Sequence, residues 1–427
     1  MSNNTFTLDM FGNTALSTGL GIGVTGFAHA NPIAANDDEP DPTPPTPARA
    51  MPIPSAATPT PKQGERSNCY LDLDGRRLAA GWKERAKANV AAILVAGEIE
   101  KQERPATLEE QEKLIRFTGF GASELANGMF RRPGEIEFRD GWEDLGGLLE
   151  AAVDEADYAS LARCTQYAHF TPEFIVRAIW AGLQRLGWRG GRVLEPGIGT
   201  GLFPALMPEA YRATSHVTGI ELDPVTARIV RLLQPKARIV NADFSRTDLG
   251  VVYDLAIGNP PFSDRTVRSD HHYRPLGLRL HDYFIARAID LLKPGGLAAF
   301  VTSSGTMDKA DATAREHIAK SANLVAAIRL PEGSFRRDAG TDTVVDILFF
   351  RKRKIAEASD DVSWLDIEEV RPATEDEGAI RVNRWFANNP DFVLGEHAVT
   401  SGPFGETYTC RPRAGEDLGS ALKAVVS

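Results

Sequence analysis

A short stretch in the middle of the chain combines an amide side chain, two prolines and an aromatic ring. Residues 255–257 form an apolar run that predicts a buried strand, and after one glycine the chain continues with Asn259, Pro260, Pro261 and Phe262. The prolines cannot donate to a β-ladder, and their rings stiffen the backbone. An asparagine before a proline is most often a plain rigid turn. That interpretation explains neither the second proline nor the phenylalanine that follows it.

The same residues are suited to holding an amino group attached to a nucleic-acid base. The exocyclic nitrogen of adenine is a poor nucleophile, because its lone pair is delocalised into the ring. The side-chain oxygen of Asn259 and the carbonyl oxygen of Pro260 could accept its two N–H bonds and direct the lone pair at an electrophile. The two prolines would fix that carbonyl before reaction begins, and Phe262 could stack on the base. This chemistry requires no metal and no covalent intermediate.

A glycine-rich turn precedes this stretch and could bind a nucleotide-like cofactor. In the segment VLEPGIGTG, residues 193–201, an apolar run leads through Glu195 to Gly197 and Gly199 and then to a predicted helix. Glycines in such a turn let the backbone approach a ligand closely. A tight turn without a ligand explains this segment equally well when it is taken alone.

Two further acidic residues follow the next predicted strands. Glu221 ends a strand about 20 residues after the glycine turn, where an acid can accept hydrogen bonds from ribose hydroxyls. Asp243 ends the following strand, where it could accept from an adenine amino group while Phe244 packs on the ring. Structural alternatives exist, since Asp223 before Pro224 is typical of a helix N-terminus, and an aspartate after a strand is often a turn residue. Three acids at successive strand ends favour the cofactor interpretation.

Strands and helices must alternate to bring these residues to one edge of a sheet. Strand-like segments lie at residues 191–197, 216–223, 237–244, 253–258, 297–304, 324–330 and 343–352, and helical segments separate most of them. This alternation predicts right-handed βαβ units and a doubly wound, mostly parallel, Rossmann-like sheet of the α/β class. Only a loop joins the last two strands, which predicts an antiparallel pair at one edge. Ligands of such sheets bind at the carboxyl ends of the strands, where Asn259 stands.

The order of these segments resembles that of the amino-group DNA methyltransferases with the gamma arrangement of motifs. HFTPE comes first, at residues 169–173, and VLEPGIGTG, IELD, NADF and GNPPF follow it. The resemblance covers about residues 160–355 and implies S-adenosylmethionine as cofactor and DNA as partner. It implies methylation of the exocyclic N6 of adenine by direct in-line displacement, after the base has left the stack.

The resemblance also implies roles for single residues. Phe170 and Thr171 would lie near the methionine end of the cofactor. The other cofactor contacts would come from Glu195, Gly197, Gly199, Glu221, Asp243 and Phe244. The target base would be held by Asn259, Pro260, Pro261 and Phe262. The segment AIRLPEGSF looks like a later motif that places an aromatic ring, here Phe335, against the flipped base.

A narrower resemblance extends beyond the predicted sheet. Residues 281–318 and the segment VNRWFANNPDFVLG, residues 382–395, are similar to the methylase portion of long helicase-methylase proteins of plasmids and phages. This implies a mobile-element or restriction-modification context and a separately encoded helicase as a candidate partner. Other functions stay open: N4 of cytosine as the target, N5-glutamine protein methylation, for which Tyr is more usual than Phe262, or a catalytically weak DNA-binding or antirestriction protein.

Basic residues after the Asn-Pro-Pro-Phe stretch could contact DNA phosphates. Arg265, Arg268 and Arg274 lie in a polar segment that also holds a tyrosine and two histidines, and such clusters attract phosphates. A solvated surface loop explains them equally well. The net charge of −10 does not exclude DNA, because much of the acidity lies toward the two ends of the chain.

Composition divides the 427 residues into four parts. Residues 1–66 form a Pro- and Ala-rich tail that predicts disorder. Residues 75–165 predict a helical region, residues 166–355 the catalytic sheet, and residues 356–427 an extension with one helix near NRWFANN. No apolar run reaches the ~20 residues that span a bilayer, so no membrane partner is expected. Three widely spaced cysteines fit a reducing cytoplasm.

Overall fold

A computed structural model describes residues 66–131, 134–166, 170–354, 357, 361–374, 377–402 and 405–427. The tail that the sequence predicts to be disordered therefore lies, except for its last residue, outside the described residues. Among the described residues, no helix is both long enough and apolar enough to cross a lipid bilayer.

A seven-stranded sheet forms the centre of the molecule, with the strand order β3-β2-β1-β4-β5-β7-β6. Its strands are β1 (Gly191–Pro196), β2 (Ser215–Glu221), β3 (Arg238–Asn241), β4 (Tyr253–Gly258), β5 (Leu292–Ser303), β6 (Ala322–Leu330) and β7 (Val345–Lys352). Neighbouring strands from β3 to β5 pair in parallel, and β7 pairs antiparallel with both β5 and β6. The predicted doubly wound Rossmann-like sheet and its antiparallel edge pair are confirmed.

Helices cover both faces of this sheet. They are α6 (Glu173–Arg185), α7 (Leu202–Ala205), α8 (Glu209–Arg212), α9 (Pro224–Leu233), α10 (Leu280–Asp290), α11 (Gly305–Asp308), α12 (Thr313–Ala319) and α13 (Arg336–Ala339). Side chains of α10 and α12 share one apolar core with one face, and those of α6 and α7 share another core with the opposite face. Neighbouring β1 residues follow this division, since Leu194 joins the first core and Val193 the second. The alternation is that of a strand buried on both faces.

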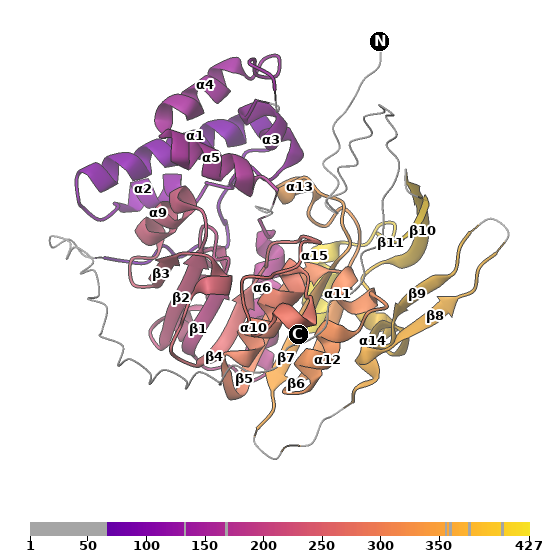
Figure 1. Cartoon of the computed structure of the whole chain (residues 1–427). Helices are drawn as coiled ribbons and strands as arrows, with labels where there is room; N and C mark the ends of the chain where they lie inside the picture. Colours follow the sequence, from indigo (N-terminus) through magenta and orange to yellow (C-terminus); the bar gives the residue numbers. More distant parts are fainter. Residues whose placement is uncertain are drawn as a thin grey trace, which may run out of the picture.

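The N-terminal helical region contains α1 (Trp82–Lys101), α2 (Leu108–Leu114), α3 (Ser123–Met129), α4 (Glu143–Ala152) and α5 (Glu155–Cys164). The predicted capping box of Thr107 and Glu110 begins α2, whereas α3 and α4 were not predicted as separate helices. These helices gather above α9 at one end of the molecule (Figure 1). Their apolar core includes Val225, Ile229 and Leu233 of α9, so the region packs on the sheet domain as a continuous layer.

The C-terminal extension adds two hairpins and two helices. Its elements are β8 (Ile367–Arg371), β9 (Ile380–Asn383), α14 (Arg384–Asn388), β10 (Glu396–Gly402), β11 (Gly405–Arg411) and α15 (Leu418–Val426). The expected helix near NRWFANN is confirmed as α14. The hairpins β8-β9 and β10-β11 were not predicted from the sequence.

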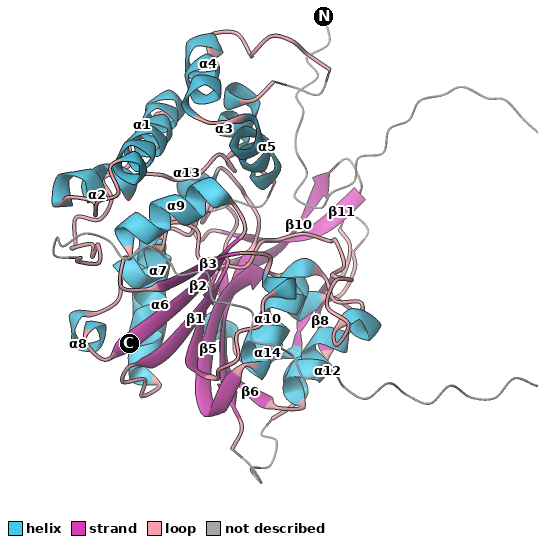
Figure 2. Ribbon diagram, turned by 60° about the vertical axis from the view of Figure 1, so that its left-hand side comes forward, coloured by secondary structure: helices cyan, strands magenta, loops and turns pink. Residues whose placement is uncertain are grey.

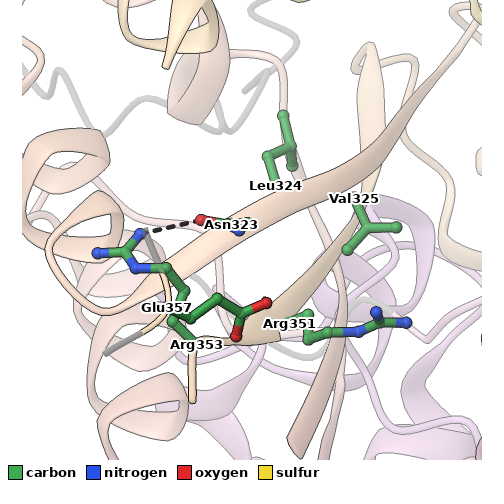
Figure 3. A pocket seen from close by; sticks show the side chains of 6 residues that line it. All are labelled: Asn323, Leu324, Val325, Arg351, Arg353 and Glu357. Carbon is green, nitrogen blue, oxygen red and sulfur yellow. Dashed lines mark hydrogen bonds between the residues drawn. The ribbon is translucent and has the colours of Figure 1, made fainter. Parts of the chain in front are cut away.

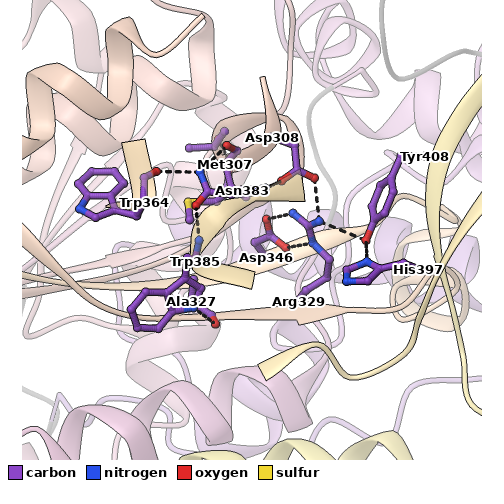
Figure 4. Close-up of polar contacts among 12 residues, drawn as sticks. Met307, Asp308, Ala327, Arg329, Asp346, Trp364, Asn383, Trp385, His397 and Tyr408 are labelled. Carbon is purple, nitrogen blue, oxygen red and sulfur yellow. Dashed lines mark hydrogen bonds and ion pairs between the residues drawn. The ribbon is translucent and has the colours of Figure 1, made fainter. Parts of the chain in front are cut away.

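A buried arginine joins this extension to the sheet (Figure 4). The guanidinium of Arg329, in β6, is 0% exposed and makes paired contacts of 2.8 Å with Asp346 of β7. It also lies 2.7 Å from Asp308 and donates to the Tyr408 hydroxyl at 3.1 Å. The Phe386 ring covers it, 4.1 Å from the guanidinium carbon. Phe386 and Tyr408 of the extension therefore help to enclose the positive charge of Arg329, which belongs to the sheet.

Candidate active site at the carboxyl edge of the sheet

The predicted site residues follow four neighbouring parallel strands. Pairing aligns Glu195 of β1 with Gly219 of β2, and Glu221 of β2 with Asn241 of β3. β4 lies on the other side of β1 and ends at Gly258, directly before Asn259. Because parallel strands present their carboxyl ends at one edge, the loops after β1, β2, β3 and β4 are neighbours. Figure 2 shows β1, β2 and β3 side by side.

The glycine turn after β1 lies between two other predicted segments. Gly197 and Gly199 have φ angles of 73° and 55°, in the left-handed region that favours glycine. A Cβ atom on Gly199 would come within 3.3 Å of the Phe170 ring. A Cβ atom on Gly197 would lie 3.8 Å from Pro261. The structure therefore brings the Phe-Thr-Pro segment, the glycine turn and the Asn-Pro-Pro-Phe loop together, and the neighbouring Thr171 is buried.

Buried oxygen atoms line this turn. The Glu195 side chain is only 2% exposed, and its Oε2 has no hydrogen-bond partner among the described residues. The same holds for Oγ1 of Thr200. Burial, with a smaller effect from Glu221, raises the pKa of Glu195 well above its ordinary value. The Cγ atom of Glu195 would be 3.6 Å from a Cβ on Gly258, so this acid lies beside the start of the Asn-Pro-Pro-Phe loop. Buried oxygens without partners are expected where a ligand supplies the missing donors.

Glu221 is held by two backbone amides. Its Oε2 accepts from the Gly199 amide and its Oε1 from the Asp223 amide, both at 2.9 Å. Burial is the main cause that raises the pKa of Glu221 from 4.5 to about 7. Leu222 follows it with an exposed side chain, 62% accessible. The sequence reasoning missed this residue, although an apolar side chain between two acids at a strand end was a usable signal.

Asp223 has the capping role that the sequence offered as the structural alternative. Its Oδ2 accepts from the amide and the hydroxyl of Thr226, each at 2.7 Å, and Pro224 begins α9. The Ser160 hydroxyl donates to the other oxygen of Asp223 at 2.7 Å. Asp223, the capping residue, is buried, with 1% of its surface exposed.

Asp243 and Phe244 differ in how they could meet a ligand. Asp243 accepts from the amide and hydroxyl of Ser245 at 2.8 Å and caps a short 3-10 turn, yet 43% of its side chain stays exposed. Phe244 is 2% exposed, because Phe284 and the Arg287 guanidinium pack on it at 5.0 and 4.6 Å. The Phe244 ring therefore belongs to the core. The expectation that this ring packs on the cofactor is corrected, because protein side chains already cover it.

The Asn-Pro-Pro-Phe loop is partly buried against α10. Asn259 and Pro261 are half-buried, Pro260 is buried, and Phe262 is 9% exposed. The Phe262 ring meets His281 edge to face, with centroids 6.2 Å apart. Burial lowers the pKa of His281, and neither of its ring nitrogens has a hydrogen-bond partner among the described residues. His281 is thus a neutral packing residue behind Phe262.

Three exposed arginines follow this loop. Arg265, Arg268 and Arg274 are exposed in a segment that is anchored to the fold at several points. The Tyr283 hydroxyl donates to Asp270 at 2.8 Å, and the Ser269 hydroxyl lies 2.6 Å from that of Ser245, next to Asp243. The arginines therefore extend from a segment fixed beside the site.

Phe335 follows β6, whose carboxyl end lies at this same edge of the sheet, but its ring is enclosed by the protein. Phe335 is 1% exposed and packs in the core between α6 and the sheet. The expectation that it faces a flipped base is corrected, since its apolar ring is covered by the protein. A pocket of about 260 Å³ is lined by Asn323, Leu324, Val325, Arg351, Arg353 and Glu357 (Figure 3). It lies where β6 begins and the antiparallel β7 ends, which is the amino edge of the parallel strands, opposite Asn259.

Comparisons with known proteins agree with this geometry. The model of the N-6 DNA methylase family matches residues 156–381, just over half of the chain. Defense against restriction protein B of Escherichia phage P1 is 30% identical over 190 residues, 43% of this chain and 8% of that protein. The type II methyltransferase M.TthHB8I of Thermus thermophilus is 33% identical over 129 residues, 26% of this chain and 29% of that enzyme. The chain thus spans less than a third of either relative, and the resemblance to one portion of a long phage protein is confirmed.

Solved structures with a similar course of the chain include two methyltransferases. A modification subunit of a putative type I restriction enzyme from Vibrio vulnificus is 21% identical, with a TM-score of 0.37 and 57% of each chain covered. A putative class I S-adenosylmethionine-dependent methyltransferase from Listeria monocytogenes is 17% identical, with a TM-score of 0.42, and covers 65% of this chain and 91% of its own. The family match, together with the strand order and the site after β1, β2 and β4, leads to one conclusion. This chain belongs to the N-6 DNA methylase family and has S-adenosylmethionine as its cofactor.

Proposed function

We propose that this protein transfers a methyl group from S-adenosylmethionine to the exocyclic N6 of adenine in DNA, on a base that has left the stack. The observation that carries the proposal is the position of the Asn-Pro-Pro-Phe loop. It follows β4 directly, and Pro261 approaches the glycine turn at Gly197. An amine held by this loop would meet a ligand of the glycine turn at the edge where α/β sheets bind their ligands.

The residues at the edge fit the cofactor. S-adenosylmethionine supplies an electrophilic methyl group when it is bound. Glu195 Oε2 and Thr200 Oγ1 are buried oxygens without protein partners among the described residues, and they suit the polar end of such a ligand. Glu221 can accept from the ribose hydroxyls, and the exposed Leu222 offers an apolar contact for a purine ring. We assign Asp243 to the adenine amino group, and Phe170 and Thr171 to the methionine end.

The loop residues would prepare the target amine. The Asn259 side-chain oxygen and the Pro260 carbonyl would each accept one N–H, so that the nitrogen lone pair points toward the methyl donor. Pro260 and Pro261 restrict the backbone, which lowers the cost of holding the acceptors in place. Phe262, packed against His281, would stack on the base. The proton of the methylated amine would leave to solvent, since His281 is buried and its pKa is lowered.

Transfer of labelled methyl groups tests the proposal. Purified protein, labelled S-adenosylmethionine and unmethylated DNA, duplex or single-stranded, should give labelled DNA. Asn259→Ala should lower the rate by about 100-fold or more, because removing one preorganised partner of a reacting group costs that much. Asn388→Ala changes an exposed asparagine of α14 and should leave the rate unchanged. Labelled nucleosides should elute as N6-methyladenine.

Other outcomes of the same assay would overturn the proposal. Incorporation no higher than with Asn259→Ala would rule out transfer by this loop. Label in N4-methylcytosine would move the target to cytosine, and label recovered only in protein would favour glutamine methylation. Each result identifies a different acceptor, because the loop can hold any planar amine.

The similarity to a phage protein named for defense against restriction favours a second candidate, a catalytically weak antirestriction protein. Protection of DNA from restriction would then need binding and not transfer. If Asn259→Ala protects DNA as well as the wild type does, this second function is supported and methylation is not its cause.

A further inference from the structure

The N-terminal helical region reaches the cofactor site through one hydroxyl group. We propose that Ser160, on α5, is a positioning residue for the cofactor: it fixes Asp223, and Asp223 in turn fixes Glu221. The inference rests on the proposed role of Glu221 at the ribose. It gives a function in cofactor binding to helices whose purpose the sequence left open.

Three hydrogen bonds link α5 to the glycine turn through Asp223 and Glu221. The Ser160 hydroxyl donates to Asp223 Oδ1 at 2.7 Å. The Asp223 amide donates to Glu221 Oε1 at 2.9 Å, and the Gly199 amide donates to Glu221 Oε2 at 2.9 Å. The other oxygen of Asp223 is occupied by the amide and hydroxyl of Thr226. Every oxygen of the two carboxylates therefore has a defined donor.

Burial makes the first bond in this chain important. Ser160 is 4% exposed and Asp223 is 1% exposed, so water cannot readily replace the hydroxyl. A buried carboxylate that loses a donor pays the desolvation cost of the vacated oxygen. Asp223 can relieve that cost only by shifting, and its amide is one of the two donors that orient Glu221. A change at α5 is thereby passed to the carboxylate that would bind ribose.

The segment that follows the helical region lies beside the glycine turn. The Phe170 ring lies within 3.3 Å of the Cβ position of Gly199, and Gly199 supplies the second amide to Glu221. Glu221 is thus held by two amides: that of Asp223, whose carboxylate accepts from Ser160, and that of Gly199, which lies beside Phe170. This arrangement favours a positioning role for α5 over simple packing on α9.

A second contact between α5 and α9 provides a matched control. Arg228 of α9 lies 3.3 Å from Asp157 of α5, and within the described part of the chain no hydrogen bond or ion pair joins this pair to Asp223 or Glu221. Asp157→Asn would loosen the docking of the helical region without removing the Ser160 hydroxyl. Ser160→Ala would remove the hydroxyl and keep the ion pair.

Binding of S-adenosylmethionine to the full chain, measured by calorimetry without DNA, tests the inference. Ser160→Ala should weaken the affinity by about tenfold, because a hydrogen bond to a charged buried group is lost. Ser160→Thr, which keeps the hydroxyl, should bind more tightly than Ser160→Ala. Asp157→Asn should stay within about twofold of the wild type, and the thermal midpoint of each variant shows that it folds.

Hydrogen exchange in the free protein gives an independent readout. The amides of Gly199 and Asp223 should exchange faster in Ser160→Ala than in Asp157→Asn, because only the former releases Glu221. Equal affinities of Ser160→Ala and wild type, or an equal loss in both variants, would overturn the inference. So would the absence of S-adenosylmethionine binding to the wild type. A protein that binds the cofactor as expected and yet fails to methylate DNA would refute the proposed function alone.

Discussion

In the role proposed for it, Glu221 must be ionised to accept strongly from ribose hydroxyls, and its environment works against that charge. Burial raises its pKa from 4.5 to about 7, so the carboxyl is half protonated near neutral pH. The folded protein then holds this proton up to a higher pH than the unfolded chain does. The contribution of this group to the free energy of unfolding of the free protein therefore decreases as the pH rises from 4.5 to about 7.

Cofactor binding should show the opposite dependence on pH. The dissociation constant for S-adenosylmethionine should rise as the pH falls below about 7, by up to about tenfold for each unit. Calorimetric titrations between about pH 6 and about pH 8 would measure this slope. Glu221→Gln should bind more weakly at the upper end and lose the slope. A wild-type slope that survives in Glu221→Gln would assign the titration to another group.

Gly199 permits a second prediction at the scale of the residue. Its φ of +55° disfavours any side chain, and a Cβ atom would press on the Phe170 ring at 3.3 Å. Gly250 has a similar φ of +59° but open space around its Cβ position. Both alanine variants should lose about 1–2 kcal/mol of stability through the backbone, whereas only Gly199→Ala should also weaken cofactor binding. Equal binding by both variants would contradict contact between the turn and the cofactor.

At the scale of the element, the segment between β4 and α10 extends three exposed arginines beside the site. Arg268→Ala should weaken DNA binding uniformly across sequences and reduce the dependence of log affinity on log salt by about 1, if it neutralises one phosphate. Arg189→Ala changes an exposed arginine before β1, at the amino edge, and should leave that dependence unchanged. Titrations at several salt concentrations would compare the two variants. Identical salt slopes for Arg268→Ala and the wild type would assign the DNA contact to another element.

Elements with strong periodic patterns were predictable from the sequence, and contacts between distant elements were not. The apolar run of β4 and the Asp223-Pro224 start of α9 are local signals, and both predictions are confirmed. The residues of β8 are mostly exposed, so no alternation of apolar residues marked this strand. The bond from Ser160 to Asp223 joins residues 63 positions apart and depends on how two helices dock. Phe244 and Phe335 show the converse case, since their positions in motifs suggested ligand contacts while tertiary packing placed their rings in the core.

At the scale of the whole molecule, Arg329 links the sheet to the C-terminal extension. Arg329→Ala should destabilise the protein by about 3–5 kcal/mol, because it leaves the Asp346 carboxylate buried without its partner. Tyr408→Phe removes one hydroxyl contact of the same guanidinium and the hydrogen bond between that hydroxyl and His397, and should cost about 1–2 kcal/mol. Urea unfolding of both variants would measure the difference. Equal losses would show that the ion pair contributes no more than the hydroxyl.

The buried arginine also orders events during synthesis of the chain. Arg329 and Asp346 leave the ribosome before Phe386 and Tyr408, which later cover the guanidinium. The Arg329 charge is therefore only partly enclosed while about sixty further residues emerge. Strands that are exposed in this interval can pair incorrectly. The segment that contains Phe386 and Tyr408 thus completes the enclosure of Arg329, and a chain that stops before this segment would leave the guanidinium partly uncovered.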